Sequence, residues 1–172
     1  KMVINGLDFL EVMPLNKLDL DKSLVSECSP SGGPKLKDLF MELNINNNDT
    51  IIDIGCGKGF LVNDLINSCQ IDAYGVDISE YALQSSMNEV AGRLHLQDMR
   101  KLTFPDDAFD AVLCINTLHN LPKVEAFMAI REMNRVVKSK KNIFIQVDSY
   151  RTNEDLKIFE DWVLTAKLYM TP

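Results

Sequence analysis

A short apolar strand that runs into a glycine-rich turn constrains this chain more than any other feature. Residues 50–54 are followed at once by the sequence GCGKG at residues 55–59, and Asp53 stands two residues before the first glycine. Glycine is required where a backbone takes positive φ or approaches a ligand closely, because it has no Cβ. The pattern predicts a buried strand, a tight turn and a helix, with a ligand held against the turn. The alternative is a tight turn that binds nothing.

The spacing of these glycines separates two classes of nucleotide ligand. A dinucleotide site expects the pattern G-x-G-x-x-G, in which a helix N-terminus holds a pyrophosphate. Here the third glycine comes one residue early, Phe60 takes the expected position, and Asp53 places negative charge beside the pyrophosphate. We expect a ligand with a positive centre and no phosphate, such as S-adenosylmethionine, which carries a sulfonium and an ammonium. An NAD(P)-dependent oxidoreductase remains the alternative.

Predicted strands and helices alternate along the chain. The strands are expected at Thr50–Ile54, Ala73–Val76, Leu94–Leu96, Ala111–Ile115 and Asn142–Val147. Helices are expected from Pro34, after Gly59, from Ser79 to about Val90, from Pro122 through Val137 and from Thr152. The helix after Gly59 is expected to bury Leu61, Val62, Leu65, Ile66, Ser68 and Cys69. This order predicts an α/β fold with a doubly wound, mostly parallel sheet, helices on both faces and right-handed crossovers.

Polar side chains stand where the predicted strands end. Asp77 ends the second strand, where a carboxylate can accept hydrogen bonds from both hydroxyls of a ribose. Asp98 ends the third, where it can accept from the exocyclic amine of adenine. Nicotinamide enzymes also place an acid at the position of Asp77 but do not require Asp98. Together with Asp53, Asn116 and Asp148, these residues would point at the carboxyl edge of the sheet, where such folds bind ligands.

Five stretches of the chain, taken in order, resemble the motifs of class I S-adenosylmethionine-dependent methyltransferases, in the branch that acts on small molecules. They lie at residues 51–59, 74–79, 97–99, 104–112 and 116–120, within the range 35–150. The resemblance implies a Rossmann-like methyltransferase fold and transfer of a methyl group from S-adenosylmethionine to a small-molecule acceptor, with release of S-adenosylhomocysteine. It is specific for the cofactor and does not identify the acceptor.

The resemblance also implies a cofactor site at the turn and the strand ends. Asp53 and the glycine turn would hold the methionine part, and Asp77 would bind the ribose hydroxyls. The adenine would lie against Ile78 with its edge at residues 98–99, and Asn116 would close the site. The implied cofactor-binding residues are Asp53, Gly55, Cys56, Gly57, Gly59, Asp77, Ile78, Asp98, Met99 and Asn116.

Methyl transfer is an in-line displacement, so the enzyme aligns the two reactants and in some cases removes a proton from the acceptor. His119, after the fourth strand, is the predicted proton acceptor because the usual pKa of histidine suits this role. Capping a helix or packing in a loop is its alternative role. Asp148 and Tyr150 are further candidates on the acceptor side, whereas His95, inside the third strand, is expected only to pack.

The length of 172 residues favours one domain. Residues 1–33 are expected to form an irregular N-terminal segment or lid, and residues 34–172 the methyltransferase domain. The family normally ends in an antiparallel strand pair after the last helix. Because the chain stops at Pro172, that pair is expected to be missing and the fifth strand to be a sheet edge. A non-catalytic cofactor-binding partner protein with the same fold is a second alternative.

Composition narrows the classes of partner and compartment. The net charge of −7 argues against nucleic acid, whose ligands usually carry a basic stripe. The cluster Lys138, Lys140 and Lys141 is predicted to be the charged end of a helix. No apolar stretch approaches the roughly 20 residues that cross a bilayer. The four cysteines lack C-x-x-C spacing, which predicts a reduced, cytoplasmic protein without a disulfide framework or a metal site.

Overall fold

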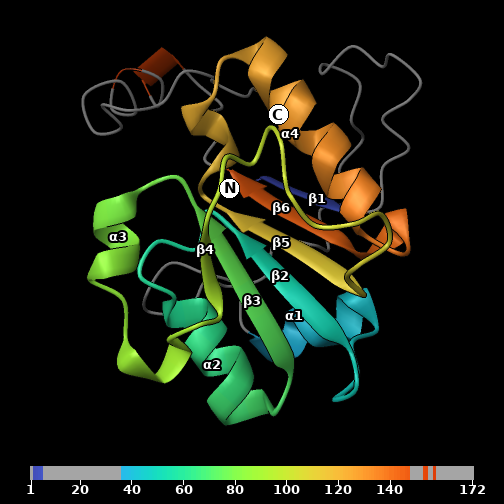
Figure 1. Cartoon of the computed structure of the whole chain (residues 1–172). Coiled ribbons are helices and arrows are strands. Elements are labelled where there is room, and N and C mark those ends of the chain that lie inside the picture. Colours follow the sequence, from blue (N-terminus) through green and yellow to red (C-terminus); the bar gives the residue numbers. More distant parts are fainter. Residues whose placement is uncertain (1, 6–35, 148–152, 155–156, 158–172) are drawn as a thin grey trace.

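A six-stranded sheet forms the centre of the part of the chain that the structure describes (Figure 1). This computed structural model describes residues 2–5, 36–147, 153, 154 and 157. The strands are β1 (Met2–Asn5), β2 (Thr50–Ile54), β3 (Asp72–Asp77), β4 (Leu94–Leu96), β5 (Ala111–Ile115) and β6 (Ile143–Val147). Their order across the sheet is β1-β6-β5-β2-β3-β4, so β2, the strand before the glycine turn, lies near the centre.

Strands β2 to β6 form the parallel part of the sheet. β2 pairs with both β3 and β5, β4 extends the sheet beyond β3, and β6 extends it beyond β5. From β2 the chain therefore adds β3 and β4 on one side of the sheet, and then returns to add β5 and β6 on the other side. The point between β2 and β5 where the direction changes is where folds of this kind leave a crevice at the carboxyl edge. The five predicted strands are confirmed, each to within one residue at either end.

The N-terminal strand β1 is a departure from the predicted fold. Met2–Asn5 pairs antiparallel with β6, with Met2 opposite Val147 and Asn5 opposite Phe144. The prediction that the whole of residues 1–33 is irregular is therefore wrong at these four residues. The prediction that β6 is a sheet edge is wrong for the same reason, because β1 covers that edge.

The helices lie on both faces of the sheet (Figure 1). They are α1 (Leu36–Leu43), α2 (Phe60–Cys69), α3 (Glu80–Gln84) and α4 (Lys123–Val136), with short 3-10 turns η3 (Asn88–Val90), η4 (Leu118–Asn120) and η5 (Lys140–Asn142). Apolar residues of α1 and α2 pack on one face of the sheet, and those of α4 pack on the other. The continuous apolar sequence of β5 follows from this arrangement, because both of its faces are buried.

Two predicted helical features differ from the structure. The helix expected from Ser79 to about Val90 ends at Gln84, and a separate 3-10 turn follows at Asn88–Val90. Serines at positions 85 and 86 explain the early end, because serine competes with the helix by bonding nearby backbone groups. In α2, Ser68 was expected to be buried but is exposed, and the fully buried residues are Val62 and Leu65.

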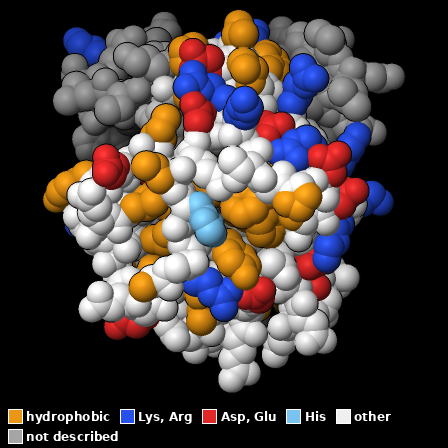
Figure 2. All heavy atoms as spheres, in the orientation of Figure 1, with side chains coloured by type: hydrophobic (Ala, Val, Ile, Leu, Met, Phe, Trp, Pro, Cys, Tyr) orange, Lys and Arg blue, Asp and Glu red, His pale blue; other side chains and the backbone are white. Residues whose placement is uncertain are grey.

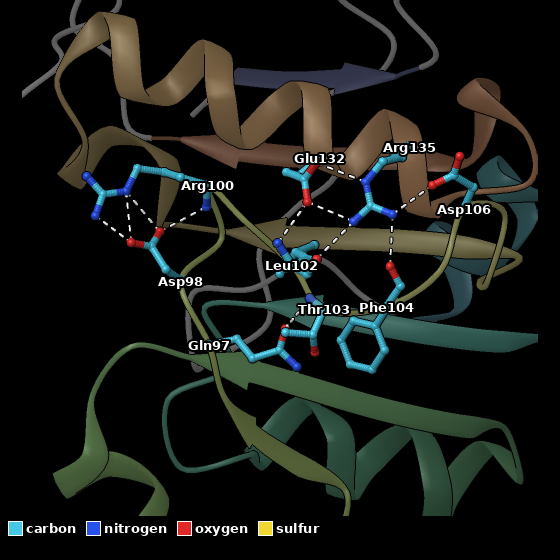
Figure 3. A network of polar contacts seen from close by, with 9 residues as sticks. All are labelled: Gln97, Asp98, Arg100, Leu102, Thr103, Phe104, Asp106, Glu132 and Arg135. Carbon is cyan, nitrogen blue, oxygen red and sulfur yellow. Dashed lines mark hydrogen bonds and ion pairs between the residues drawn. The ribbon is translucent and has the colours of Figure 1, made fainter.

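The connection from β4 to β5, residues 97–110, contains no helix and is held by side chains of α4 (Figure 3). Arg135 donates to the carbonyl oxygens of Leu102 and Phe104 at 3.0 and 2.8 Å. Glu132, beside it on the helix, accepts from the backbone N–H of Leu102 at 2.8 Å. Because these contacts replace the backbone bonds that a helix would make, α4 fixes the path of the loop that begins with Asp98.

Candidate functional site

The glycine turn is shaped by two close approaches. The N–H groups of Gly55 and Cys56 both donate to the carbonyl of Val76 in β3, at 2.8 and 3.0 Å. Gly55 has a φ of 83°, and a Cβ on it would lie 2.2 Å from the side chain of Thr117. Only glycine fits there, since both the conformation and the space exclude a side chain. The turn therefore brings the ends of β2, β3 and β5 together.

Gly57, at the middle of the turn, is open to its surroundings. Its φ is 54°, and a Cβ built on it meets no atom within 4 Å. Its N–H donates to Oδ2 of Asp77 at 2.8 Å, which ties the turn to the end of β3. The space in front of Gly57 is therefore a place where a ligand could approach the backbone.

Asp77 is held by the backbone on both of its oxygens. While Oδ2 accepts from Gly57, Oδ1 accepts from the N–H of Ser79 at 2.8 Å. The side chain of Ser79 in turn caps α3 by accepting from Ala82. Each carboxylate oxygen has a second lone pair available, so the fixed carboxylate can still accept hydrogen bonds from a ligand.

Asp53 is a buried carboxyl group in β2, with 4% of its surface exposed. Burial, with a smaller contribution from the negative charge of Asp77, raises the pKa of Asp53 to about 7. A buried carboxylate without a neutralising partner is costly, and a cationic ligand would lower that cost. The pKa of Asp53 should therefore depend on the charge of any group bound at the glycine turn.

Asp98, after β4, is bound by the guanidinium of Arg100. Oδ1 accepts from the backbone N–H and from Nε of Arg100, both at 2.9 Å, and Oδ2 accepts from the guanidinium as well (Figure 3). These hydrogen bonds hold the pKa of Asp98 below its usual range. Arg100 also forms an ion pair with Glu125 in the first turn of α4.

Several of these residues line a pocket at the carboxyl edge of the sheet. Its lining residues are Gly55, Val76, Asp77, Ile78, Gln97, Asp98, Met99, Thr117 and Leu121. They come from the turn after β2, the ends of β3 and β4, and the segment after β5. The pocket therefore lies at the switch point that the strand order creates, with two carboxylates at its rim.

The pocket contains five of the predicted site residues and four that the sequence did not single out. Gly55, Asp77, Ile78, Asp98 and Met99 line it, whereas Asp53, Cys56, Gly57, Gly59, Asn116 and His119 do not. The additional lining residues are Val76, Gln97, Thr117 and Leu121. The first three stand directly beside predicted residues, and that adjacency is the signal that could have identified them.

Cys56 serves the packing of the turn. It is buried, and a Cβ on Gly75 would lie 2.7 Å from its Cβ and Sγ, so the thiol fills the space that Gly75 leaves. Burial, followed by the charges of Asp53 and Asp77, raises the pKa of this thiol. A thiol with a raised pKa is a poor nucleophile, so Cys56 is not suited to covalent chemistry.

The two histidines lie in different surroundings. His95 in β4 stacks on Tyr74 at 6.2 Å and meets the edge of Phe104 at 5.5 Å between ring centroids, which confirms the predicted packing role. His119 lies in η4, two residues after Thr117, and has 4% of its surface exposed.

Asn116, the residue predicted to close the site, directly follows β5. It has a φ of 53°, and its N–H donates to the carbonyl of Gln146 at 2.8 Å.

Some predicted features lie outside the described residues. Asp148, Tyr150 and the helix containing Trp162 belong to this group, as does most of the segment 1–33. Within the described part of the chain, no helix is long and apolar enough to cross a membrane. The same residues include no group of three or more His, Cys, Asp or Glu side chains arranged to hold a metal ion.

A mostly parallel sheet with a glycine turn after its central strand, and with acids at the ends of the next two strands, is the arrangement of α/β folds that hold ligands at the carboxyl edge of the sheet. Residues 52–145, more than half of the chain, match the family described as a methyltransferase domain. The chain belongs to this family, the class I S-adenosylmethionine-dependent methyltransferases, and has their Rossmann-like fold.

Relatives and solved structures place the chain among varied members of the fold. It is 30% identical over 125 residues to ajmaline N-methyltransferase of Rauvolfia serpentina, covering 66% of this chain and 42% of the relative. It is 31% identical over 91 residues to the mitochondrial arginine-hydroxylase NDUFAF5 of Rattus norvegicus, covering 51% and 25% of the two chains. An S-adenosylmethionine-dependent methyltransferase of Methanosarcina mazei superposes with a TM-score of 0.58 at 25% identity, covering 70% and 61%. The chain spans less than half the length of the curated relatives that it matches.

Proposed function

We propose that this domain binds S-adenosylmethionine and transfers its methyl group to a small-molecule acceptor. The observation that carries the proposal is the pocket at the carboxyl edge, where Asp77 is fixed by the backbone of the glycine turn and Asp98 lines the same pocket. In this proposal Asp77 accepts from the ribose hydroxyls, Ile78 covers the adenine, and residues 98–99 recognise its edge. S-adenosylmethionine supplies the activated methyl group, and the chain supplies its binding and alignment.

Two features of the glycine turn support the proposal that the methionine part of the cofactor binds there. The open space before Gly57 leaves room for a ligand against the backbone, and the buried carboxyl of Asp53 favours a cation there. Cys56 and Gly59 shape the turn, and Asn116 is proposed to close the site after β5. The argument from Phe60 against a dinucleotide is weakened, because this ring is 62% exposed and does not pack between helix and strand. The argument from the charge of Asp53 stands.

The proposal of a small-molecule acceptor is supported by the charge distribution and by one relative. On the face shown in Figure 2, the described Lys and Arg side chains are interspersed with Asp and Glu rather than arranged in a continuous stripe. Arg135 pairs with Asp106 and Glu132, and Lys138 pairs with Asp110. A nucleic acid surface would need these cations free. Ajmaline N-methyltransferase, by its name, acts on a small molecule.

We propose a reducing compartment such as the cytoplasm. Of the four cysteines, Cys56, Cys69 and Cys114 lie among the described residues, and all three are free thiols. Burial raises the pKa of Cys114 to about 12, so this thiol is poorly reactive. Free thiols are typical of proteins that remain in a reducing environment.

Calorimetric titration with S-adenosylhomocysteine, with NADH titrated in parallel, tests the cofactor class. We expect micromolar binding of S-adenosylhomocysteine and no binding of NADH. Binding of NADH alone would establish the oxidoreductase alternative, and binding of neither would contradict the proposed site. Incubation with methyl-labelled S-adenosylmethionine and a panel of small molecules then tests catalysis, since a non-catalytic partner protein would bind the cofactor but release no S-adenosylhomocysteine.

Replacing Asp77 tests the assignment of the ribose site. Asp77→Asn keeps one carbonyl acceptor but removes the charge, and it should weaken S-adenosylhomocysteine binding by about 10- to 100-fold, as expected for lost hydrogen bonds to a charged group. Asp72→Asn is the matched control, because Asp72 lies at the other end of β3, away from the pocket lining, where it pairs with Arg93. Equal affinities of the two variants would remove Asp77 from the site.

A further inference from the structure

Arg100 joins two carboxylates that belong to different parts of the fold. Its guanidinium binds both oxygens of Asp98 at the pocket and also pairs with Glu125 in the first turn of α4. Arg100 itself is not among the residues that line the pocket. Figure 3 shows the guanidinium directed at Asp98 from the start of the 97–110 connection. Arg100 therefore binds a residue that lines the pocket, Asp98, without lining the pocket itself.

This arrangement fixes the direction of the Asp98 carboxylate. Nε lies 2.9 Å from Oδ1 and 3.0 Å from Oδ2, and a second guanidinium nitrogen also binds Oδ2, so two donors of one planar group hold the carboxylate. Glu125 holds the far side of the same guanidinium, and α4 in turn fixes Glu125. Three N–H groups of Arg100 (the backbone N–H, Nε and one terminal guanidinium nitrogen) take up three of the roughly four lone-pair sites of the Asp98 carboxylate, which leaves one to accept from a ligand donor.

We propose that Arg100 is a positioning residue that holds the Asp98 carboxylate in the direction needed to accept from the exocyclic amine of a purine, and so sets the preference of the pocket for adenine over hypoxanthine. This inference rests on the proposed function. An amine donates to a carboxylate, whereas the carbonyl oxygen of hypoxanthine meets it with two acceptors facing each other. The preference depends on direction, because hydrogen bonds weaken steeply as their angle departs from linear.

Lysine cannot replace arginine in this role. A guanidinium presents several donors in one plane and binds both oxygens of a carboxylate, whereas an ammonium is a point charge, which would leave the orientation of the carboxylate mainly to the backbone N–H of residue 100. Arg100→Lys should therefore keep the charge balance and lose the alignment. Arg100→Ala loses both.

The test compares two probes on four forms of the whole chain. S-adenosylhomocysteine and its hypoxanthine analogue, S-inosylhomocysteine, are titrated into the wild type, Arg100→Ala, Arg100→Lys and Arg93→Ala, and thermal unfolding of each form is recorded. Arg93 is the matched control, because it also pairs with one aspartate, Asp72, but lies outside the pocket lining. The ratio of the two affinities is the readout, since a loss of stability alone would weaken both ligands together.

We expect the wild type and Arg93→Ala to prefer S-adenosylhomocysteine by about tenfold or more. In Arg100→Ala the ratio should fall toward one, and in Arg100→Lys it should fall to an intermediate value that remains measurable if the alanine variant does not fold. An unchanged ratio in both Arg100 variants, with or without a weaker affinity, overturns the positioning role and leaves the proposed function intact. Failure of the wild type to bind either probe overturns the proposed function and this inference with it.

Discussion

At the scale of single residues, Asp53 is a carboxyl group that the fold removes almost entirely from water. Burial raises its pKa in the folded state to about 7, well above the ordinary value of an aspartic acid, so the native state favours the protonated form. The sign follows from linkage: the ionised form costs stability, so the unfolding free energy falls as pH rises from about 4 to about 7. The raised pKa corresponds to a loss of at most about 4 kcal/mol of unfolding free energy at neutral pH and above.

Asp53→Asn should remove this dependence on pH. The amide has similar shape and no charge, so the variant should gain in Tm relative to wild type as pH rises from 5 to 8, measured without ligand. Asp64→Asn, at an exposed position of α2, is the control and should follow the wild type. If the difference between Asp53→Asn and wild type stays constant with pH, Asp53 does not titrate in this range.

His119 carries the proposed proton transfer but is buried in η4 and does not line the pocket. Direct contact with an acceptor therefore requires η4 to shift when ligands bind. His119→Ala should lower turnover by about 10²- to 10⁴-fold, the usual contribution of general base catalysis, with little change in affinity for S-adenosylhomocysteine. Full turnover would leave His119 with a packing role only. Loss of cofactor affinity together with Tm would point to the same conclusion.

At the scale of elements, side chains of α4 hold the connection of residues 97–110, and Arg135 makes several of these contacts. Arg135 donates to Leu102, Phe104, Asp106 and Glu132, and its side chain is 30% exposed. Arg135→Ala should lower stability by about 2–3 kcal/mol, or roughly 5–10 °C in Tm, because two backbone carbonyls lose their donor. Arg131→Ala, exposed one turn earlier, should stay within about 0.5 kcal/mol of wild type. Equal unfolding of the two variants would show that the loop is held by its apolar contacts instead.

The sequence predicts the elements whose signals are local. β2, β4 and β5 have the predicted bounds. For β2 and β5 the signal is an apolar run that specifies a buried parallel strand, whereas β4 is only partly buried and was predicted from its short apolar segment before Asp98. α3 is shorter than predicted, because its apolar spacing continues past the two serines that end it. β1 was missed, since four residues carry little pattern and their partner β6 lies about 140 positions later in the chain.

The residues of the candidate site also divide into those with a local sequence signal and those without one. The glycine turn and the acids after β3 and β4 are readable because each is adjacent in sequence to the strand that places it. Thr117 was missed, since its contact with Gly55 depends on the distance between β2 and β5. The pairing of Arg100 with Glu125 was missed because it depends on how α4 is placed along the sheet, which no local pattern encodes.

At the scale of the whole molecule, β1 determines whether the outer edge of β6 is covered. β6 is buried along its full length, and β1 supplies the antiparallel neighbour that covers its outer edge. Without β1, an apolar strand would present a row of unpaired backbone N–H and C=O groups, which is a template for association with another chain. The two ends of the described chain, far apart in sequence, are thus joined in one ladder.

Deleting residues 1–5 should therefore lower Tm and cause the protein to associate as its concentration rises. The association should be visible in light scattering coupled to size-exclusion chromatography, as a mass that increases with loading while the wild type keeps a constant mass over the same range. Deleting Lys1 alone is the control, because Met2–Asn5 still pairs with β6. Because the pocket lies between β2, β3, β4 and the segment after β5, the monomeric fraction of the variant should keep most of its affinity for S-adenosylhomocysteine. An unchanged mass and an unchanged Tm would mean that β1 contributes nothing to the stability of the sheet, and that another segment of the chain covers the edge of β6.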